Sequence, residues 1–383
     1  MGSEPKGVDL TLGDHHQFPP VARPIRDALF YPSNSETDSV TSQIGRAIYE
    51  EFTTVVILKE QKQITDHVWL DFLQHLRKGV VENRHIEMLR SLIIRRDKEN
   101  DVDFSQSPWS EAALVTPRHA VRVQWNNAAL RKMCQANGRQ VFVCTAEDTY
   151  KSRALSIGEK CSLEAHRGHA RRKNRGAKDL PYQVDLSIGM KVMVTENVET
   201  DLDITNGARG EIVGIVLHQD KPDRGQNPIV KLKYLPTYLL IKLTHTRAST
   251  LEGLDKGVIP VEPASTTYHV RITTKEGKTG TRTMRRRQFP VAAAYSFTDY
   301  RSQGQTIPYV IVDIAPPPTG TLNLFNLYVA LSRSSGRETI RLLRDIDDKM
   351  FNRSHDPALI EEDERLERLD RQTKEAYDRY ISV

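Results

Sequence analysis

The sequence predicts an α/β protein in which a small all-β module interrupts a parallel sheet with helices. Three observations support this fold class. Short apolar runs alternate with amphipathic helical patterns before residue 145 and again after residue 290. Between them, short strands separated by Gly, Pro, Asn and Asp dominate residues 185–288, as in a small β-barrel. A nearly continuous apolar run at 309–314 is typical of a strand buried in a parallel sheet.

Local signals define the first elements in chain order. Frequent prolines predict loops in the first fifty residues, with one short strand at 8–12. A helix is predicted from the caps Thr65 and Asp66 to residue 78, because its apolar residues follow i, i+3, i+4, i+7 spacing and Gly79 can close it. A second helix is predicted at 84–94.

A strand–helix–strand unit follows, and it predicts a parallel sheet with a helical crossover. Its strands are expected at 112–115 and 140–144, and its helix at 119–137. A very basic loop is expected at 166–178. The strands of the all-β module are predicted at 190–195, 210–217, 238–243 and 258–263. Behind it we expect a strand at 309–314, a helix at 322–334, a strand at 339–343 and a charged helix at 357–381.

Composition limits the class of protein. Of the 383 residues, 55 are Lys or Arg and 50 are Asp or Glu, so the net charge of +5 permits a polyanionic partner without requiring one. Three cysteines exclude a disulfide scaffold and suit a reducing compartment. No apolar run approaches the length of a membrane span, and the first residues lack an apolar signal region, so we expect no membrane partner.

Four polar stretches could contribute chemistry, and each also has an ordinary structural explanation. Residues 13–21, GDHHQFPPV, could bind a ligand at the end of a strand or form a Pro-rich turn. Residues 297–306, FTDYRSQGQT, could hold a phosphate or form a polar loop. Residues 328–333, YVALSR, end in an arginine that could stabilise a transferring phosphate or lie at the surface. Residues 206–210, NGARG, form a hairpin turn.

In this order and spacing, the stretches resemble the superfamily 1B DNA helicases of the Pif type, in the form carried by Helitron transposons. Residues 13–21 resemble motif III, 58–79 motif IV and its helix, 299–306 motif V and 328–333 motif VI. Residues 115–126 resemble a stretch typical of the Helitron-type branch. The similarity covers about residues 8–345.

The resemblance implies two RecA-like domains that close on ATP and Mg²⁺ and step 5′ to 3′ along single-stranded DNA, with an SH3-like barrel inserted in the second domain. It also implies work in DNA repair, recombination and telomere maintenance, and hence nuclear localisation. The implied divisions are a remnant of the first RecA-like domain at 1–52, the second RecA-like domain at 53–184 and 289–350, the barrel at 185–288 and a charged C-terminal helix at 351–383.

The resemblance also implies roles for individual residues. Gln17 would sense the γ-phosphate and Arg333 would be the catalytic arginine finger. The other nucleotide-binding candidates are Asp14, Gln63 and Gly304, and the DNA-binding candidates are Arg301, Ser302, Gln303, Thr306, Thr116 and Asn126. No metal ligand is predicted, because Cys161, His166 and His169 lack a fourth zinc ligand at suitable spacing.

Two departures from the family pattern leave the activity open. No Gly-x-x-x-x-Gly-Lys-Ser/Thr loop occurs, and the chain begins at motif III, so nearly all of the first RecA-like domain is expected to be missing. Gln63 also stands where motif IV usually has an arginine. The hypotheses are therefore the motor portion of an ATP-dependent DNA helicase, with an N-terminal helicase domain as a further partner, a non-catalytic nucleic-acid-binding remnant, or an incomplete gene model of a longer enzyme.

Overall fold

The computed structural model describes residues 11, 13–20, 24–95, 102–173, 180–197, 204–220, 227–246, 250–273, 279–317 and 321–382, with only the backbone at 167–173 and 273. The strand predicted at 8–12 lies almost wholly outside these residues. The chain divides into two compact units, Met1–Arg118 with Thr298–Val383, and His119–Phe297. In the described residues, no helix is both long enough and apolar enough to cross a membrane.

The first unit contains the parallel sheet that the sequence predicts. Strand β15 (Val310–Val312) pairs in parallel with β1 (Ala113–Val115) on one side and with β16 (Ile340–Leu342) on the other. All three β15 side chains are buried, which explains their continuous apolar sequence. The residues that follow β1 and β15 therefore lie at the same edge of the sheet.

Helices of the first unit form where local signals favour them. Helix α2 (His67–Lys78) begins after Asp66, whose carboxylate accepts hydrogen bonds from the backbone of Val68 and Trp69, and ends at the left-handed Gly79. Its buried face packs against α7 (Leu324–Leu331). Helix α3 (Asn83–Ser91) follows, and α6 (Asp299–Ser302) is a single turn.

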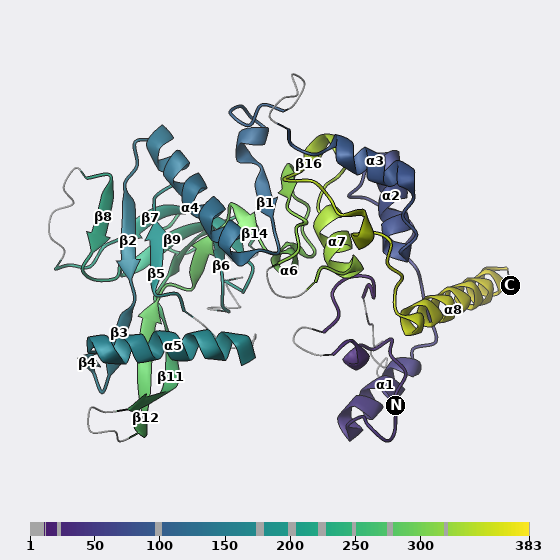
Figure 1. Ribbon diagram of the computed structural model, residues 1–383, viewed down its shortest axis with the longest axis horizontal. Coiled ribbons are helices and arrows are strands. Elements are labelled where there is room, and N and C mark those ends of the chain that lie inside the picture. Colours follow the sequence, from purple (N-terminus) through teal and green to yellow (C-terminus); the bar gives the residue numbers. More distant parts are fainter. Residues whose placement is uncertain are drawn as a thin grey trace. The chain divides into compact units, whose positions relative to one another are not determined.

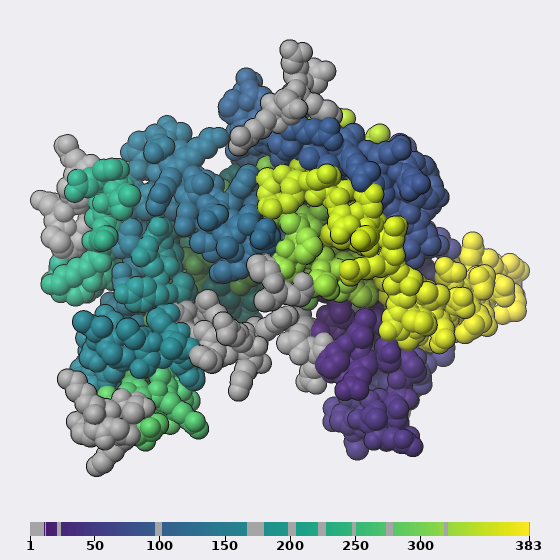
Figure 2. All heavy atoms as spheres, viewed as in Figure 1, coloured from purple at the N-terminus to yellow at the C-terminus, as the bar shows by residue number. Residues whose placement is uncertain are grey.

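The N-terminal segment is more helical than predicted, because α1 (Val40–Glu50) forms where we expected a loop. The Ser39 side chain caps this helix. In the segment that precedes the helix, Ala28 and Phe30 pack against Phe325 and Leu359. Helix α8 (Pro357–Ile381) matches the predicted charged helix. Figure 2 shows it in yellow, with its C-terminal half protruding from the first unit.

The second unit is larger than the predicted β-module of 185–288. Its five-stranded antiparallel sheet has the order β10-β9-β7-β6-β13, with bounds Val258–Val261, Tyr238–Leu243, Arg209–Val216, Lys191–Val194 and Val291–Ala293. Four of these strands match the predicted ones. The second unit begins with α4 (His119–Ala136), and its last element is β14 (Ser296–Phe297).

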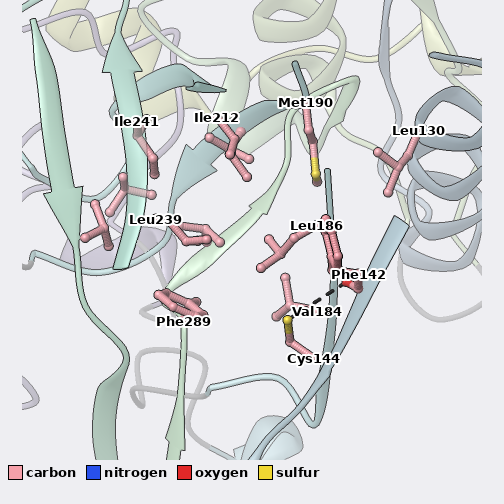
Figure 3. Close-up of a cluster of buried hydrophobic side chains, with 14 of the residues drawn as sticks. Leu130, Phe142, Cys144, Val184, Leu186, Met190, Ile212, Leu239, Ile241 and Phe289 are labelled. Carbon is pink, nitrogen blue, oxygen red and sulfur yellow. Dashed lines mark hydrogen bonds between the residues drawn. The ribbon is translucent and has the colours of Figure 1, made fainter. Parts of the chain in front are cut away.

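One predicted connection is wrong. Strand β2 (Val141–Thr145) does not join the sheet of β1 but pairs with β5 (Gln183–Leu186) and β8 (Ile229–Leu232). Figure 3 shows why: Phe142 on β2 and Leu186 on β5 face Ile212 and Leu239 of the five-stranded sheet, in one hydrophobic core. The buried apolar side chains of β2 thus complete the core of the second unit.

A second sheet in this unit has the order β11-β12-β3-β4, with bounds Ala264–Thr273, Thr279–Gln288, Glu147–Tyr150 and Arg153–Ala154. Helix α5 (Ile157–Lys173) packs against it (Figure 1), where Leu163 meets Val270 and Met284. The basic loop predicted from residue 166 is therefore helical as far as 173, and 174–178 lie outside the described residues.

Candidate functional site

The loop at 13–18 is organised by the Asp14 carboxylate. This group accepts hydrogen bonds from the His16 backbone at 3.1 Å, the Gln17 amide at 3.2 Å and Arg77 Nη2 at 3.0 Å. Burial alone would raise the pKa of Asp14, but the Arg77 guanidinium and the other donors hold it below its ordinary value. Asp14 is therefore an ionised group that fixes Gln17 and the α2 residue Arg77 in one cluster.

Two contacts join this loop to residues 299–306. The Gln303 amide nitrogen donates to Gln17 Oε1 at 3.0 Å. The Phe18 and Tyr300 rings stack with centroids 3.9 Å apart and an angle of 15° between their planes. Two segments almost three hundred residues apart in the sequence thus meet through an amide pair and an aromatic pair.

The 299–306 segment has a rigid start. The Thr298 side chain accepts from the Arg301 backbone and caps α6, and Asn326 Nδ2 donates to Asp299 Oδ2 at 2.6 Å. Ser302 is fully buried, and its hydroxyl donates to the Asp299 carbonyl at 2.7 Å. Gly304 has φ of +72°, a left-handed conformation that favours glycine and turns the chain after α6.

Arg333 is directed into the protein rather than toward a ligand. Only 4% of it is exposed. Its Nη1 donates to the carbonyls of Ser302 at 3.1 Å and Gln305 at 3.0 Å, and its Nε donates to the Val329 carbonyl at 2.7 Å. Burial lowers its pKa. In this structure Arg333 ties the end of α7 to the 299–306 segment, and the predicted reach across a cleft is not seen.

Arg301 differs from Arg333 in having no carboxylate or carbonyl partner among the described residues. Its pKa is lowered by burial alone, with no acidic group opposing the shift. Gln303 and Thr306 are exposed beside it in the sequence. A partly buried, unpaired guanidinium followed by exposed amide and hydroxyl groups is suited to an anionic ligand such as a phosphate.

The structure does not bring the other predicted site residues to this cluster. Gln63 is exposed in the turn before α2, and the described residues show no contact between it and the cluster. Thr116 is fully buried, and its hydroxyl donates to Asp313 at 3.0 Å. Asn126, in the second unit, is 6% exposed, and its oxygen accepts from the Tyr295 and Ser296 backbone. The burial of Thr116 and Asn126 argues against direct DNA contact by either side chain.

Sequence reasoning missed the part that Arg77, Phe18 and Tyr300 play in the cluster. Phe18 and Tyr300 lie inside the stretches that we singled out, and Arg77 lies in the last turn of the motif IV-like helix. Nothing local in the sequence indicates that Arg77 pairs with Asp14, because sixty-three positions separate them.

A cluster of Asp71, His75 and His85 places possible ligand atoms within 4.8 Å of one another, but its hydrogen bonds do not fit a metal. His85 Nδ1 accepts from the Glu82 backbone at 3.1 Å, which completes the cap of α3, so its Nε2 holds the proton and donates to Asp71 at 2.9 Å. Arg84 also pairs with that carboxylate at 2.9 Å. A metal ion would have to displace both donors.

Comparison with known proteins supports the resemblance to Pif-type helicases. No family model matches the chain. A curated relative, the ATP-dependent DNA helicase PIF7 of Trypanosoma brucei brucei, is 26% identical over 344 residues, which is 85% of this chain and 31% of the relative.

Solved structures agree at the level of the fold. Bacteroides Pif1 helicase in complex with ADP-AlF3 and single-stranded DNA is matched over 92% of this chain and 65% of its own, with 17% identity and a TM-score of 0.54. Bacteroides Pif1 bound to single-stranded DNA is matched over 86% and 63%, with 16% identity and a TM-score of 0.50. The chain thus spans about a third of the curated relative and under two thirds of these structures. Together with the parallel sheet and its helices, these matches show an α/β fold that fits the RecA-like class, and homology to Pif1-type helicases.

Proposed function

We propose that this chain is the C-terminal motor portion of an ATP-dependent 5′-to-3′ DNA helicase of the Pif type, in its Helitron-like branch, and that it binds single-stranded DNA. In this proposal the five-stranded sheet of the second unit corresponds to the SH3-like barrel, and the site of action is the nucleus. An N-terminal helicase domain outside this chain would be its partner.

The observation that supports the proposal most is the linkage of three motif-like segments. Gln17 in the first bonds to Gln303 in the second, and Arg333 in the third bonds to the carbonyls of Ser302 and Gln305. A displacement of one segment would therefore break a contact with another. Such linkage is what a motor needs to transmit the nucleotide state to the Arg301 region, where an unpaired guanidinium can contact a DNA phosphate.

The residues of this chain do not by themselves fit ATP and Mg²⁺. The sequence has no Gly-rich loop ending in Gly-Lys-Ser/Thr to cradle the phosphates. Asp14, the carboxylate at the centre of the cluster, is already neutralised by Arg77, and the Arg333 donors are occupied by carbonyls. These observations favour a second candidate function, a nucleic-acid-binding protein without ATPase activity of its own.

Binding of a fluorescein-labelled DNA strand by the purified chain tests the feature that both candidates share. We expect sequence-independent binding that weakens steeply as salt rises, because each neutralised phosphate releases condensed counterions. Arg301→Gln should weaken binding, whereas Arg301→Lys should retain most of it. An affinity that does not change with salt, or no binding at low salt, would refute the proposal.

A further inference from the structure

The hairpin of β11 and β12 has two chemically different faces. Side chains alternate between the faces of a strand, so even-numbered residues of β12 point one way and odd-numbered residues the other. On the even-numbered face, Met284 and Arg286 are fully buried, and Leu163 of α5 packs against Met284. The odd-numbered face is exposed at every described position of both strands.

Arginines on the covered face are neutralised by carboxylates. Arg286 donates to Asp148 at 2.6 and 2.7 Å and to Glu164 at 2.7 Å, and Arg282 pairs with Glu159. Arg286 is thus a structural residue, although it lies between the exposed Arg285 and Arg287. Each arginine on the covered face of the described hairpin therefore has a carboxylate partner within the protein.

Arginines on the exposed face lack such partners, except at one end. The described residues offer no carboxylate to Arg271 or Arg285, and Arg285 Nη2 donates only to the Ser265 hydroxyl at 3.0 Å. Arg287 pairs with Glu147 at 3.1 Å. Neither strand exposes a large hydrophobic side chain. We call this surface the hydroxyl–arginine face; its residues are Ser265, Thr267, His269, Arg271, Thr281, Thr283, Arg285 and Arg287.

A hollow lies at the Arg287 end of this face. Its volume is about 300 Å³, and its lining residues are His218, Gln219, Leu235, Pro236, Thr237 and Arg287. The exposed His218 and Tyr234 rings are 4.9 Å apart and inclined by 33°. The hollow therefore combines the His218 ring with the apolar Leu235 and Pro236 and with Arg287, and Tyr234 contacts the His218 ring without lining the hollow.

We propose that the hydroxyl–arginine face binds the sugar–phosphate backbone of a single DNA strand and that the hollow receives one of its bases. The chemistry is complementary: guanidinium and hydroxyl groups are donors for phosphate oxygens, and ring surfaces stack on bases of any sequence. Arg285 and Arg287 are about 7 Å apart along the strand, so they place two guanidinium groups in sequence along an extended polyanion, and Arg285 carries the charge that no carboxylate of the described residues offsets. An acidic protein is disfavoured, because neither strand of the face exposes a large hydrophobic side chain that could anchor it. The inference rests on the proposed DNA-binding function.

Charge reversal on the face tests the inference. The variant Arg271→Glu/Arg285→Glu should bind a labelled oligothymidine strand at least ~10-fold more weakly, and the slope of log affinity against log salt should fall by about 1.4, since each contact to a single strand contributes ~0.7. The matched control is Arg131→Glu/Lys132→Glu on α4, two exposed residues whose reversal changes the net charge equally. This control should change both quantities much less.

Two further measurements separate backbone from base recognition. Arg271→Lys/Arg285→Lys should retain binding, because it keeps the charge. His218→Ala should weaken binding of the oligothymidine strand but not of an abasic strand, which has the same backbone and no bases.

The outcomes distinguish the inference from the proposed function. Absence of DNA binding by the unaltered chain would refute both. Binding that is unchanged by the face variant, or is weakened equally by the α4 control, would refute the inference alone. If the face variant lost binding only to duplex DNA, this result would also refute the inference, because the ligand of the face would then be a duplex and not a single strand.

Discussion

Removal of the Arg333 guanidinium should destabilise the first unit even where no nucleotide is present. In Arg333→Met the Gln305 carbonyl loses its donor in a site that is only 4% exposed, while the Val329 and Ser302 carbonyls keep one donor each, the Ser332 hydroxyl and the Gln305 backbone. Each lost hydrogen bond to a charged donor contributes about 1.5–3 kcal/mol, and release of a buried charge offsets much of the sum, so we expect a net loss of about 2–4 kcal/mol. For a unit of this size, that lowers the melting temperature by about 5–15 °C.

Thermal unfolding followed by circular dichroism measures this loss, and Arg301→Met is the matched control. Arg301 is an arginine of the same neighbourhood with no carboxylate or carbonyl partner among the described residues, so its replacement should shift the melting temperature by only ~1–2 °C. Equal shifts for the two variants would refute the structural role of Arg333. The expected difference also means that loss of activity in an Arg333 variant does not by itself identify an arginine finger.

Two further predictions concern packing and acid stability. Gly210→Ala should lower the free energy of unfolding by about 1–3 kcal/mol, because the new Cβ would lie 2.5 Å from the Lys242 carbonyl oxygen. In the control Gly280→Ala the new Cβ meets nothing within 4 Å, so the free energy of unfolding should hardly change. Urea unfolding of the two variants measures the difference. Partial burial of Asp66 would raise its pKa, but its hydrogen bonds from Arg337 and the backbone lower the pKa to about 2. The stabilisation by Asp66 is therefore present above about pH 4 and is lost as pH falls toward 2. Asp66→Asn should flatten that part of the acid unfolding curve, and an unchanged curve would contradict the assignment.

Elements with strong local signals could be predicted from the sequence. Helix α2 has an Asp66 cap, a periodic apolar face and a closing Gly79, and β15 is apolar throughout. Helix α1 was not predicted because a polar stretch precedes it. Its apolar residues Val40 and Ile44 lie exposed, so they do not form the buried apolar face by which a helix is recognised in a sequence.

Long-range partners could not be predicted in the same way. Alternation of strands and helices says nothing about which sheet a strand joins, and β2 joined the second unit because its side chains complete that core. The burial of Arg286 depends on Asp148 and on α5, which no local pattern indicates. Thr116 and Asn126 likewise became internal partners of distant groups.

Much of the candidate site was indicated by residue type, but its chemistry depends on pairing. Gln17 and Gln303 were both singled out, and the structure shows that they bond to each other. Arg333 was expected to face a phosphate and instead faces carbonyls. The role of Arg333 as an arginine finger stays a prediction.

The central claim is that this chain holds the linked segments of a DNA motor without the groups that cradle ATP and Mg²⁺. The most direct test is the rate of ATP hydrolysis by the purified chain with and without single-stranded DNA. We predict DNA binding without DNA-stimulated hydrolysis, because phosphoryl transfer needs the phosphate-loop lysine and the metal-holding acids that this sequence lacks. Robust DNA-stimulated hydrolysis that Arg333→Ala abolishes, at a temperature where the variant remains folded, would contradict the claim.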